Sequence, residues 1–367
     1  MTIGIVGGGQ LGRMMALAGY PLGLDFLFLD RSAEAPAARL APLIAGDPDD
    51  PELLAELARR SEVVTFDWEN VSVSALKAAA AGTRIAPPLR ALAAAQDRLS
   101  EKRTFERLRI PTTRFAAVES FAALTRAVRR IGLPGVLKTR RLGYDGKGQQ
   151  VLRTPADLQI AWARLGDAPL LYEEFVPYDY EVSIIGARGR DGSIVIYPLN
   201  RNYHHEGILR LTLAPWAAPR LARAAASSLT RVLESFRYVG VLAIEFFVRG
   251  GRLLANEMAP RVHNSGHWTI EGAVTSQFEN HLRAIAGLPL GQTATRGHSA
   301  MINLIGHMPP ARELLAEPGL HWHDYGKEAR HGRKVGHCTL VEAGIHRRNR
   351  RAASLLARLY PQLSLRP

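Results

Sequence analysis

The sequence predicts an α/β fold, α+β over the chain as a whole, that is divided into several domains. Its 367 residues are enough for two or three domains, and a hydrophobic content of 47% is enough to bury a core in each. In the first hundred residues, apolar runs typical of strands alternate with helical runs, which is the pattern of a parallel sheet. From Tyr180 onward the pattern changes to strands joined by hairpins.

The N-terminal elements follow one another closely. Strands are predicted over residues 2–6, 25–29 and 62–66, and helices over residues 10–22 and 51–60. The Ala-rich segment 78–95, which contains Pro87 and Pro88, indicates a domain boundary. The first domain is therefore expected to span residues 1–96.

Three further units complete the predicted order. Residues 97–178 carry helices over 97–108 and 121–131 and strands over 135–139 and 170–175, with a glycine-rich loop between the strands. Residues 179–296 carry strands over 181–187, 193–198, 241–248 and 252–258 and a long helix over 219–236. Residues 297–367 carry two short strands and a closing helix over 348–359.

The chain is strongly basic, with 47 Lys and Arg against 34 Asp and Glu and a formal charge of +13. Only six of these cations are Lys, an Arg bias that a GC-rich gene produces without any functional demand. The first hundred residues are net acidic, and no basic stripe interleaved with aromatic residues is found. We therefore expect sites for small anions, above all phosphates, and no nucleic-acid partner.

Several classes of protein are not expected. No apolar run approaches the roughly 18 residues of a membrane-spanning helix, and the N-terminus does not have the pattern of a secretory signal. A single cysteine, Cys338, excludes a disulfide framework, and we expect it to be a packed thiol. These observations predict a cytoplasmic protein with no membrane partner.

A glycine-rich loop joins the first predicted strand to the first predicted helix. Residues 7–12 match the pattern G-x-G-x-x-G, and Asp30 ends the second strand, where the ribose-binding acid of a dinucleotide fold belongs. Backbone N–H groups at such a turn bind any phosphate at a helix N-terminus. The motif alone leaves open a dinucleotide, another phosphorylated ligand and a purely structural turn.

A lysine on a strand precedes a second glycine-rich loop. Lys138 lies in the predicted strand 135–139, and the loop 143–148 carries three glycines and Lys147. Glycine permits close backbone approach and hinge motion, while the strand holds Lys138 rigidly. The pattern predicts a lid over a polyphosphate, and an ordinary exposed hairpin loop is the alternative.

Two glutamates lie on the strands of one predicted hairpin. Glu245 interrupts an apolar strand, where an unpaired carboxylate is costly to bury. With a three-residue loop, 250–252, Glu245 and Glu257 face each other, whereas a two-residue loop puts them on opposite faces. Facing carboxylates with the amide of Asn256 or Asn264 suit Mg²⁺ bound to nucleotide phosphates. An ion pair of Glu245 with an arginine is the alternative.

A polar run, residues 259–268, follows the hairpin. His263 and His267 have the spacing of a zinc pair, but no further ligand falls at a usual spacing, so zinc is not expected. Arg261 is a candidate clamp for an oxyanion or phosphate. Late in the chain, residues 327–337 gather cations around a glycine turn, which indicates an anion site or a solvated basic loop.

These motifs together resemble a known family. The chain resembles the ATP-grasp ligases in four features: the lysine strand, the loop 143–149, the acidic stretch 173–176 and the hairpin with Glu245 and Glu257. Among these ligases it resembles the N5-carboxyaminoimidazole ribonucleotide synthases of purine biosynthesis, through residues 7–14, 65–71, 256–268 and 332–337. The resemblance covers nearly the whole chain, and its most specific part is 256–268. One departure is Asp67, where the family pattern has Glu.

The resemblance implies a fold and a reaction. The fold is an ATP-grasp fold with an N-terminal Rossmann-like pre-ATP-grasp domain, a central region with a lid subdomain, and a small β-rich C-terminal domain. The reaction is ATP- and bicarbonate-dependent carboxylation of 5-aminoimidazole ribonucleotide through carboxyphosphate. It implies two Mg²⁺ ions, small-molecule partners and a homodimer.

The resemblance also implies roles for individual residues. ATP would contact Arg98, Lys138, Gly143, Tyr144, Asp145, Gly146, Lys147, Gly148, Gln149, Glu173, Glu174, Phe175, Val176, Glu181, His204, Asn256 and Glu257. The ribonucleotide would contact Gly8, Gly9, Gln10, Leu11, Glu69, Tyr144, Asp145, Asn264, Ser265, Lys327, Arg333 and Lys334. Metal would be held by Glu245 and Glu257, and the catalytic residues would be Lys138, Tyr144, Asp145 and Arg261.

Two other enzymes remain as alternatives. One is a different ATP-grasp ligase, such as the formate-dependent glycinamide ribonucleotide transformylase. The other is an NAD(P) oxidoreductase, which the first glycine loop alone would favour but which has no use for the paired glutamates or the lysine strand.

Overall fold

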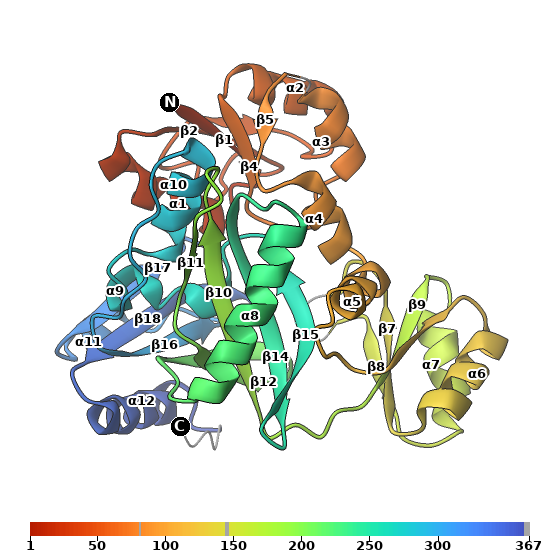
Figure 1. The fold of residues 1–367 in the computed structure, drawn as a ribbon. Coiled ribbons are helices and arrows are strands. Elements are labelled where there is room, and N and C mark those ends of the chain that lie inside the picture. Colours follow the sequence, from red (N-terminus) through yellow and green to blue (C-terminus); the bar gives the residue numbers. More distant parts are fainter. Residues whose placement is uncertain (81, 144–146, 363–367) are drawn as a thin grey trace.

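The computed structural model describes residues 1–80, 82–143 and 147–362 and arranges them around three sheets (Figure 1). Within these ranges, no helix is both long enough and apolar enough to cross a bilayer. The three sheets correspond to a small N-terminal unit, a small lateral unit and a large central unit. Their meeting point is where the site lies.

The N-terminal sheet is parallel, as predicted. Its strands are β1 (Thr2–Val6), β2 (Asp25–Asp30), β3 (Leu43–Ala45), β4 (Val63–Phe66) and β5 (Arg84–Ile85), in the order β3-β2-β1-β4-β5. Its helices are α1 (Gln10–Gly19), η1 (Tyr20–Leu22), α2 (Pro51–Arg59), α3 (Val73–Ala79) and α4 (Leu89–Ala95). The glycine loop directly follows β1, a central strand, so it lies at the carboxyl edge of the sheet.

The lateral unit is a four-stranded antiparallel sheet. Its strands are β6 (Phe115–Val118), β7 (Gly135–Thr139), β8 (Gln149–Leu152) and β9 (Leu170–Glu174), in the order β6-β9-β7-β8. Helices α6 (Phe121–Ile131) and α7 (Asp157–Leu165) cover the sheet on the side away from the rest of the molecule, while α5 (Arg98–Arg107) lies between this unit and the central sheet (Figure 1).

The central sheet has nine antiparallel strands. They are β10 (Tyr180–Arg188), β11 (Ile194–Ile196), β12 (Asn200–His205), β13 (Ile208–Ala214), β14 (Gly240–Arg249), β15 (Arg252–Ala259), β16 (His298–Ile305), β17 (Leu320–Asp324) and β18 (Lys334–Glu342). The main order is β15-β14-β10-β12-β13-β16-β18-β17, and β11 pairs with β10.

Helices complete the central unit. They are α8 (Pro219–Ser235), η2 (Asn264–Gly266), α9 (Thr269–Gly272), α10 (Gln277–Ala286), α11 (Ala311–Leu315) and α12 (Ile345–Leu359). Helix α8 buries Leu229 and Val232 in one core with Ile184 and Ile244 of the sheet. The apolar side of this amphipathic helix explains the packing on one face of the sheet.

The C-terminal strands differ from the prediction. Two short strands were expected after residue 297, but the structure has three, and β16 and β18 have eight and nine residues. They do not form a sheet of their own, because β16 pairs with β13 and extends the central sheet. Their apolar residues, such as Ile302 and Leu340, pack against Leu355 of α12.

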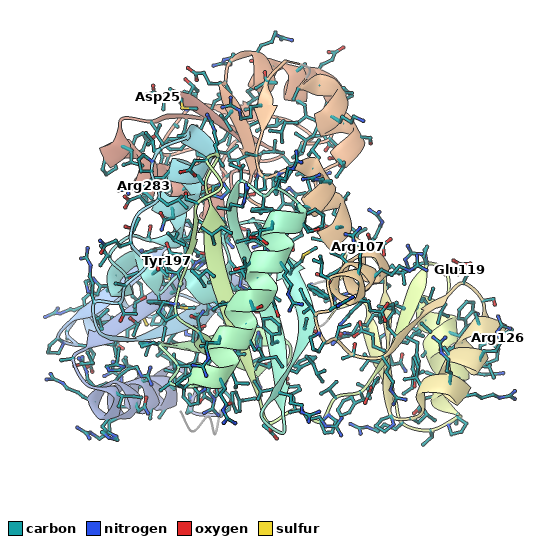
Figure 2. The ribbon with its side chains drawn as sticks, viewed as in Figure 1. Asp25, Arg107, Glu119, Arg126, Tyr197 and Arg283 are labelled. Atoms are coloured by element: carbon teal, nitrogen blue, oxygen red, sulfur yellow. The ribbon has the colours of Figure 1, made fainter. Side chains whose placement is uncertain are left out.

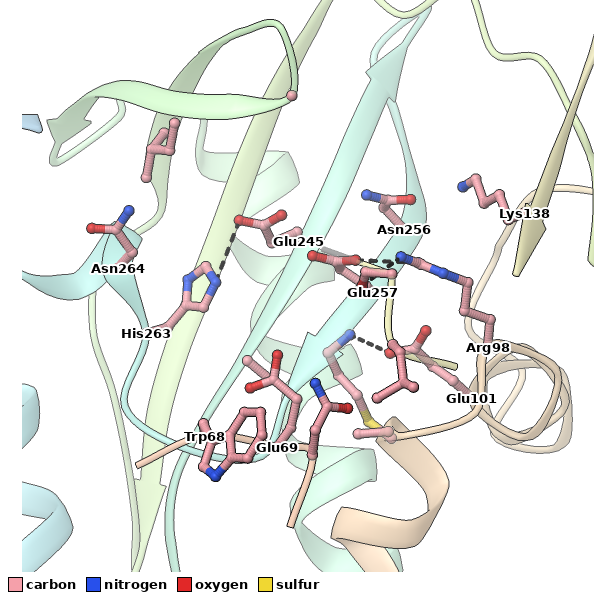
Figure 3. Close-up of a pocket in the computed structure, with 18 of the residues that line it drawn as sticks. Trp68, Glu69, Arg98, Glu101, Lys138, Glu245, Asn256, Glu257, His263 and Asn264 are labelled. Atoms are coloured by element: carbon pink, nitrogen blue, oxygen red, sulfur yellow. Dashed lines mark hydrogen bonds and ion pairs between the residues drawn. The ribbon is translucent and has the colours of Figure 1, made fainter. Parts of the chain in front are cut away.

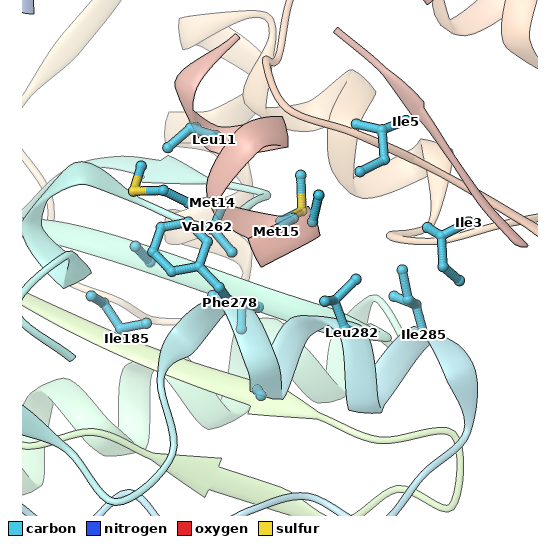
Figure 4. Packing of buried hydrophobic residues seen from close by; sticks show 14 of the residues in the cluster. Ile3, Ile5, Leu11, Met14, Met15, Ile185, Val262, Phe278, Leu282 and Ile285 are labelled. Carbon is cyan, nitrogen blue, oxygen red and sulfur yellow. The ribbon is translucent and has the colours of Figure 1, made fainter. Parts of the chain in front are cut away.

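A shared core fixes the N-terminal unit to the central unit. Leu11 and Met15 of α1 pack with Phe278, Leu282 and Ile285 of α10 in one buried cluster (Figure 4). Burying side chains of this size contributes about 1.5–3 kcal/mol each. The glycine loop at the start of α1 is thereby held at one end of the central sheet.

Much of the positive charge is on the outside. Arg107 of α5 and Arg126 of α6 are exposed, and Arg126 projects from the outer face of the lateral unit (Figure 2). The cations that could take part in binding or catalysis are therefore a minority of the Lys and Arg residues, and their position at the cavity identifies them.

Candidate active site

A cavity of about 930 Å³ opens where the three sheets meet. Its lining includes most of the residues to which the sequence assigned chemistry: Gly9, Gln10, Leu11, Glu69, Arg98, Lys138, Gly143, Gln149, Glu173, Glu174, Phe175, Val176, Glu181, His204, Glu245, Asn256, Glu257, Arg261, Asn264 and Lys334. Residues from near the start of the chain to its last unit are thus gathered in one space.

Two predicted contact residues lie behind the cavity wall. Gly8 donates its N–H to Asp30 Oδ2 at 2.7 Å and is not part of the lining. Ser265 is fully buried, and its hydroxyl accepts a hydrogen bond from Ser183 at 2.8 Å. The structure therefore does not support a direct contact between the Ser265 side chain and a ligand.

The turn of the β14–β15 hairpin has two residues. Gly250 and Gly251 form it with positive φ angles of 54° and 70°, and Arg249 pairs with Arg252. Such a pair of left-handed residues matches the twist of the flanking strands and favours glycine at both positions. The prediction of a three-residue loop, on which the facing of the two carboxylates was expected to depend, is therefore wrong.

The two carboxylates nevertheless face each other. Phe246 pairs with Ala255, and that register, continued unchanged, would place Glu245 opposite Asn256. A β-bulge interrupts the register after Ala255, so Asn256 is the extra residue and Glu245 pairs with Glu257. The predicted pairing is confirmed, but the bulge produces it and the loop length does not.

The glutamate pair lies between His263 and Arg98 (Figure 3). Burial raises the pKa of Glu245, His204 opposes this, and Glu257 raises it further. His263 Nε2 lies 3.8 Å from Glu245 Oε1, but burial holds the pKa of His263 well below its ordinary value, so this ring is neutral. Arg98 Nη1 lies 3.4 Å from Glu257 Oε2.

These residues fit a hard divalent cation. Asn256 Oδ1 is buried and has no hydrogen-bond partner, and it adjoins the two glutamates. In the described ranges, no three His, Cys, Asp or Glu side chains are grouped so as to hold a metal ion. Mg²⁺ suits such a sparse donor set, because it is usually bound by one or two carboxylates together with substrate phosphates and water.

Lys138 reaches the cavity from β7. Its ammonium lies 3.2 Å from Glu173 Oε1, and both residues are buried. Burial lowers the pKa of Lys138, while Glu173 raises it and Arg98 lowers it. The lysine is therefore a rigid donor at the cavity wall that already has one carboxylate partner.

Arg98 is placed by the start of α5. Asp97 caps this helix and receives two hydrogen bonds from Arg140, at 3.0 and 2.5 Å. Arg98 then points into the cavity, where Nη2 donates to Gly143 O at 3.3 Å in addition to the contact with Glu257. One guanidinium thus touches both the glutamate pair and the root of the glycine-rich loop.

The glycine-rich loop is described at its two ends. Thr139 N–H donates to Gly148 O at 2.8 Å, and Gly148 has a φ of 69°, which favours glycine. Gly143 and Gln149 line the cavity, and Lys147 is exposed. Tyr144, Asp145 and Gly146, for which ATP, ribonucleotide and catalytic roles were predicted, lie outside the described residues.

A histidine and a glutamate form a close pair on β10 and β12. His204 Nδ1 lies 2.6 Å from Glu181 Oε2. Burial alone would lower the pKa of His204, but Glu181 raises it to about 9, so the pair is ionic. Glu174, Phe175 and Val176 line the cavity on the side of the lateral unit.

The opposite end of the cavity contains a buried arginine. Arg261 forms an ion pair with Glu69, and both line the cavity. Burial alone would raise the pKa of Glu69, but Arg261 lowers it below its ordinary value. The pair connects the polar run after β15 with the segment after β4.

Asp67 closes the first glycine loop. Its Oδ2 accepts N–H groups from Gly9 at 2.8 Å and from Gly12 at 3.3 Å. Gly7, with a φ of 103°, could carry no Cβ, because that atom would lie 1.8 Å from Asp67 Oδ1. Burial and then Asp30 raise the pKa of Asp67, to about 6, against the two amides.

The C-terminal segment reaches the same loop. Lys327 donates a hydrogen bond to Gln10 Oε1, and burial, with Arg333, lowers the pKa of Lys327 to about 8. Lys334 lines the cavity, whereas Lys327 and Arg333 lie beside it and are not part of the lining. Cations from the last unit are thereby placed next to the first.

Sequence reasoning missed two buried charges on α5. Glu101 lines the cavity, and burial followed by Glu257 raises its pKa to about 8. Lys102 is 1% exposed and contacts Glu173 at 3.2 Å. Six of the ten residues of this helix are charged and only Leu99 and Phe105 are apolar, so its sequence gives little signal of which charges turn inward.

Comparison with known families matches most of the chain in three parts. Residues 1–96 match the ribonucleotide synthetase preATP-grasp domain, residues 103–278 the ATP-grasp domain, and residues 299–351 the phosphoribosylaminoimidazole carboxylase C-terminal domain.

Individual relatives agree with this division. The chain is 54% identical to an N5-carboxyaminoimidazole ribonucleotide synthase from Pseudomonas aeruginosa, over 93% of this chain and 94% of that protein. It is similar to the crystal structure of N5-carboxyaminoimidazole ribonucleotide synthetase from Thermus thermophilus, with a TM-score of 0.94, 50% identity and 99% coverage of both chains. It is also similar to the Aspergillus clavatus synthase in complex with ADP and 5-aminoimidazole ribonucleotide, with a TM-score of 0.90, 28% identity and 98% coverage of both chains.

Proposed function

The chain belongs to the N5-carboxyaminoimidazole ribonucleotide synthases, and from that membership we propose how its residues share the reaction. The reaction is the ATP-dependent carboxylation of 5-aminoimidazole ribonucleotide in purine biosynthesis. Bicarbonate supplies the carboxyl group: its oxygen attacks the γ-phosphorus of ATP, ADP leaves, and carboxyphosphate forms. The amine of the ribonucleotide then captures the carboxyl carbon, loses a proton, and phosphate leaves.

One observation carries the proposal. A single cavity is lined at one end by Lys138, Arg98 and the glutamate pair, and at the other by the first glycine loop and Arg261. The first set suits a nucleoside triphosphate and the second a sugar phosphate, so the two substrates meet between them. The relative from Aspergillus clavatus was crystallised with both kinds of ligand.

ATP occupies the end formed by the lateral and central sheets. Lys138 and Arg98 donate to its phosphates, and Gly143 and Gln149 line the same end of the cavity. The backbone of residues 174–176 contacts adenine, and Glu181, held by His204, accepts from the ribose hydroxyls. The side chain of Glu173 is already bound to two lysines, so its contribution to nucleotide binding is indirect.

Glu245, Glu257 and the Asn256 amide would hold Mg²⁺. When bound, Mg²⁺ neutralises phosphate charge and polarises the phosphoryl group that is transferred. The protein contributes the facing carboxylates, and the burial of Glu245 beside Glu257 favours a bound cation over an empty pair. The bulge at Asn256 sets their orientation.

The ribonucleotide lies at the other end, on Gly9 to Leu11 and Glu69. Its phosphate is drawn by Lys327, Arg333 and Lys334, and Asn264 orients its ring. Arg261 lies between the two substrates and stabilises the negative charge of carboxyphosphate, while Glu69 holds the guanidinium in place. Tyr144 and Asp145 complete the catalytic set proposed from the family resemblance.

The test is ADP release with Mg·ATP and bicarbonate, with and without 5-aminoimidazole ribonucleotide. We expect ADP release to depend on the ribonucleotide and to fall when bicarbonate is removed. Release that ignores the ribonucleotide would contradict the proposal. Substitution of formate and glycinamide ribonucleotide is expected to give no turnover, which separates this chain from the other ATP-grasp ligase considered.

Two properties of the whole molecule complete the proposal. The family resemblance supports a homodimer, and sedimentation velocity at micromolar concentration tests it, because a monomer would exclude the dimer. The role in purine biosynthesis supports a cytoplasmic location.

A further inference from the structure

Lys102 is a buried lysine that does not line the cavity but contacts residues that form its wall. Its ammonium lies 3.0 Å from Thr112 Oγ1 and 3.2 Å from each of Thr113 Oγ1, Ala255 O and Glu173 Oε2. An ammonium has three protons to donate, so these oxygens satisfy it completely. Because Lys102 is 1% exposed and is not part of the lining, it acts through its neighbours.

The first neighbour is Glu173, which is shared by two lysines. Glu173 is 2% exposed, with Oε2 toward Lys102 and Oε1 toward Lys138, each at 3.2 Å. Burial alone would raise the pKa of Glu173, but Lys102 and Lys138 lower it to about 2, so it is ionised. Two ammonium groups and one carboxylate leave one positive charge in surplus, and only Lys138 of the two lysines faces the cavity.

The second neighbour is the backbone just before the bulge. Ala255 O accepts from Lys102 and, at 2.7 Å, from Thr112 Oγ1, while Ala255 N–H donates to Pro111 O at 2.7 Å. The next residue is Asn256, whose bulge turns Glu257 toward Glu245. One ammonium on α5 thus connects β9 of the lateral sheet with β15 of the central sheet, which lie on either side of that helix (Figure 1).

We propose that Lys102 is a positioning residue of the nucleotide site. By sharing the charge of Glu173 it leaves Lys138 available to the phosphates of ATP. The inference rests on the proposed function insofar as that function assigns Lys138 to ATP. If Lys102 only filled the core, its loss would lower stability without a selective effect on ATP.

The experiment compares Lys102→Met, Lys138→Met and the double variant, with Lys77→Met, exposed on α3, as the matched control. KM for ATP, KM for the ribonucleotide and kcat are measured from ADP release, and Mg·ADP binding by calorimetry. Lys102→Met is expected to raise KM for ATP about tenfold, the size of a lost charged hydrogen bond, and to leave KM for the ribonucleotide within about twofold. In the Lys138→Met background, Lys102→Met should have no further effect.

A charge-removing variant gives the decisive readout. Adding Glu173→Gln to Lys102→Met frees Lys138 again, so KM for ATP should return to within about threefold of the parent. In this double variant the carboxylate that Lys102 neutralised is also removed, so the variant is informative even if Lys102→Met alone does not fold. Recovery of the KM for ATP supports the inference, and a KM that stays about tenfold higher overturns it.

Two results separate this inference from the proposed function. If Lys138→Met binds nucleotide as the parent does, the assignment of Lys138 to ATP is wrong and the inference falls with it. Suppose instead that Lys138→Met loses nucleotide affinity, and that Lys102→Met weakens nucleotide binding equally in the parent and in the Lys138→Met variant. Only the inference about Lys102 is then overturned.

Discussion

The two ends of the cavity are built in different ways. At the nucleotide end, several partners lie on adjacent strands: Glu245 and Glu257 share one hairpin, and Lys138 and Glu173 share the lateral sheet, while Arg98 reaches Glu257 from α5. At the ribonucleotide end, the contacts join distant parts of the chain, since Arg261 meets Glu69 across 192 positions and Lys327 meets Gln10 across 317.

The charges also differ between the ends. Burial, and then the neighbouring Glu257, raise the pKa of Glu245 against the opposing effect of His204, whereas Glu69 is matched by Arg261. The nucleotide end therefore depends on an added cation, and the ribonucleotide end on the docking of the first and last units. Substitutions at the two ends should consequently affect different kinetic constants.

The largest effect is expected at the glutamate pair. Glu257→Ala should lower kcat by about 10³-fold, because phosphoryl transfer loses a metal ligand, with little change in melting temperature since this side chain is 41% exposed. ADP release and a thermal melt measure both quantities. Glu279→Ala, a partly buried glutamate on α10, is the control, and retained activity of Glu257→Ala would refute the metal assignment.

Lys327→Ala tests the ribonucleotide end. It should raise KM for the ribonucleotide about 30-fold and leave KM for ATP unchanged, because a charged phosphate contact is lost far from the nucleotide. Arg330→Ala, an exposed cation three residues away, should change neither constant. An equal rise in both KM values would show that the two ends are not separate.

Glu101→Gln tests whether the buried carboxyl groups at the nucleotide end repel one another. Burial, with Glu257, raises the pKa of Glu101 to about 8, so the folded state binds a proton that the unfolded state has lost above about pH 4.5. Stability of the parent should therefore fall as the pH rises from 5 to 8, by about 3 kcal/mol relative to the variant. Melting temperatures across this pH range measure it, with Glu106→Gln, exposed on the same helix, as control.

Identical pH dependence in Glu101→Gln and the parent would show that Glu101 is ionised in the folded protein. The nucleotide end would then hold one more negative charge than proposed.

Asp67→Asn should have the smallest effect. Burial and Asp30 raise the pKa of Asp67 to about 6, opposed by the amides of Gly9 and Gly12 and by Arg261. At pH 5.5 Asp67 of the parent is largely protonated, so parent and variant should have the same KM for the ribonucleotide. At pH 7.5 the Asp67 carboxylate repels the ribonucleotide phosphate, so the variant should have a KM about two- to threefold lower. KM values that coincide at both pH values would place the phosphate away from this loop.

The sequence predicted the nucleotide end more completely than the other end. Strands β1 and β7 and helix α6 have the predicted bounds, because their apolar patterns and flanking glycines or caps are local signals. Lys138 on its strand, and Glu245 interrupting an apolar run, are visible for the same reason.

Other features could not be predicted because they depend on tertiary contacts. The bulge at Asn256 is set by how β15 pairs and by the bonds of Ala255 to α5 and Pro111, and nothing in its sequence signals it. Strand β16 joins the central sheet through β13, a long-range pairing that local periodicity does not encode. The inward orientation of Glu101 and Lys102 on a helix with six charged residues out of ten is hidden for the same reason.

The bulge in β15 makes a count of residues as informative as their identity. Glu245 and Glu257 are twelve positions apart, and the extra residue is what brings both to one face. A related chain that keeps this spacing and the two-residue turn, but lacks the bulge, would present one carboxylate to the opposite side of the sheet, whereas a chain with one residue fewer between the glutamates would pair them without a bulge. The spacing of the two glutamates along this hairpin therefore predicts which members of the family carry the bulge and which pair the same residues in a regular ladder.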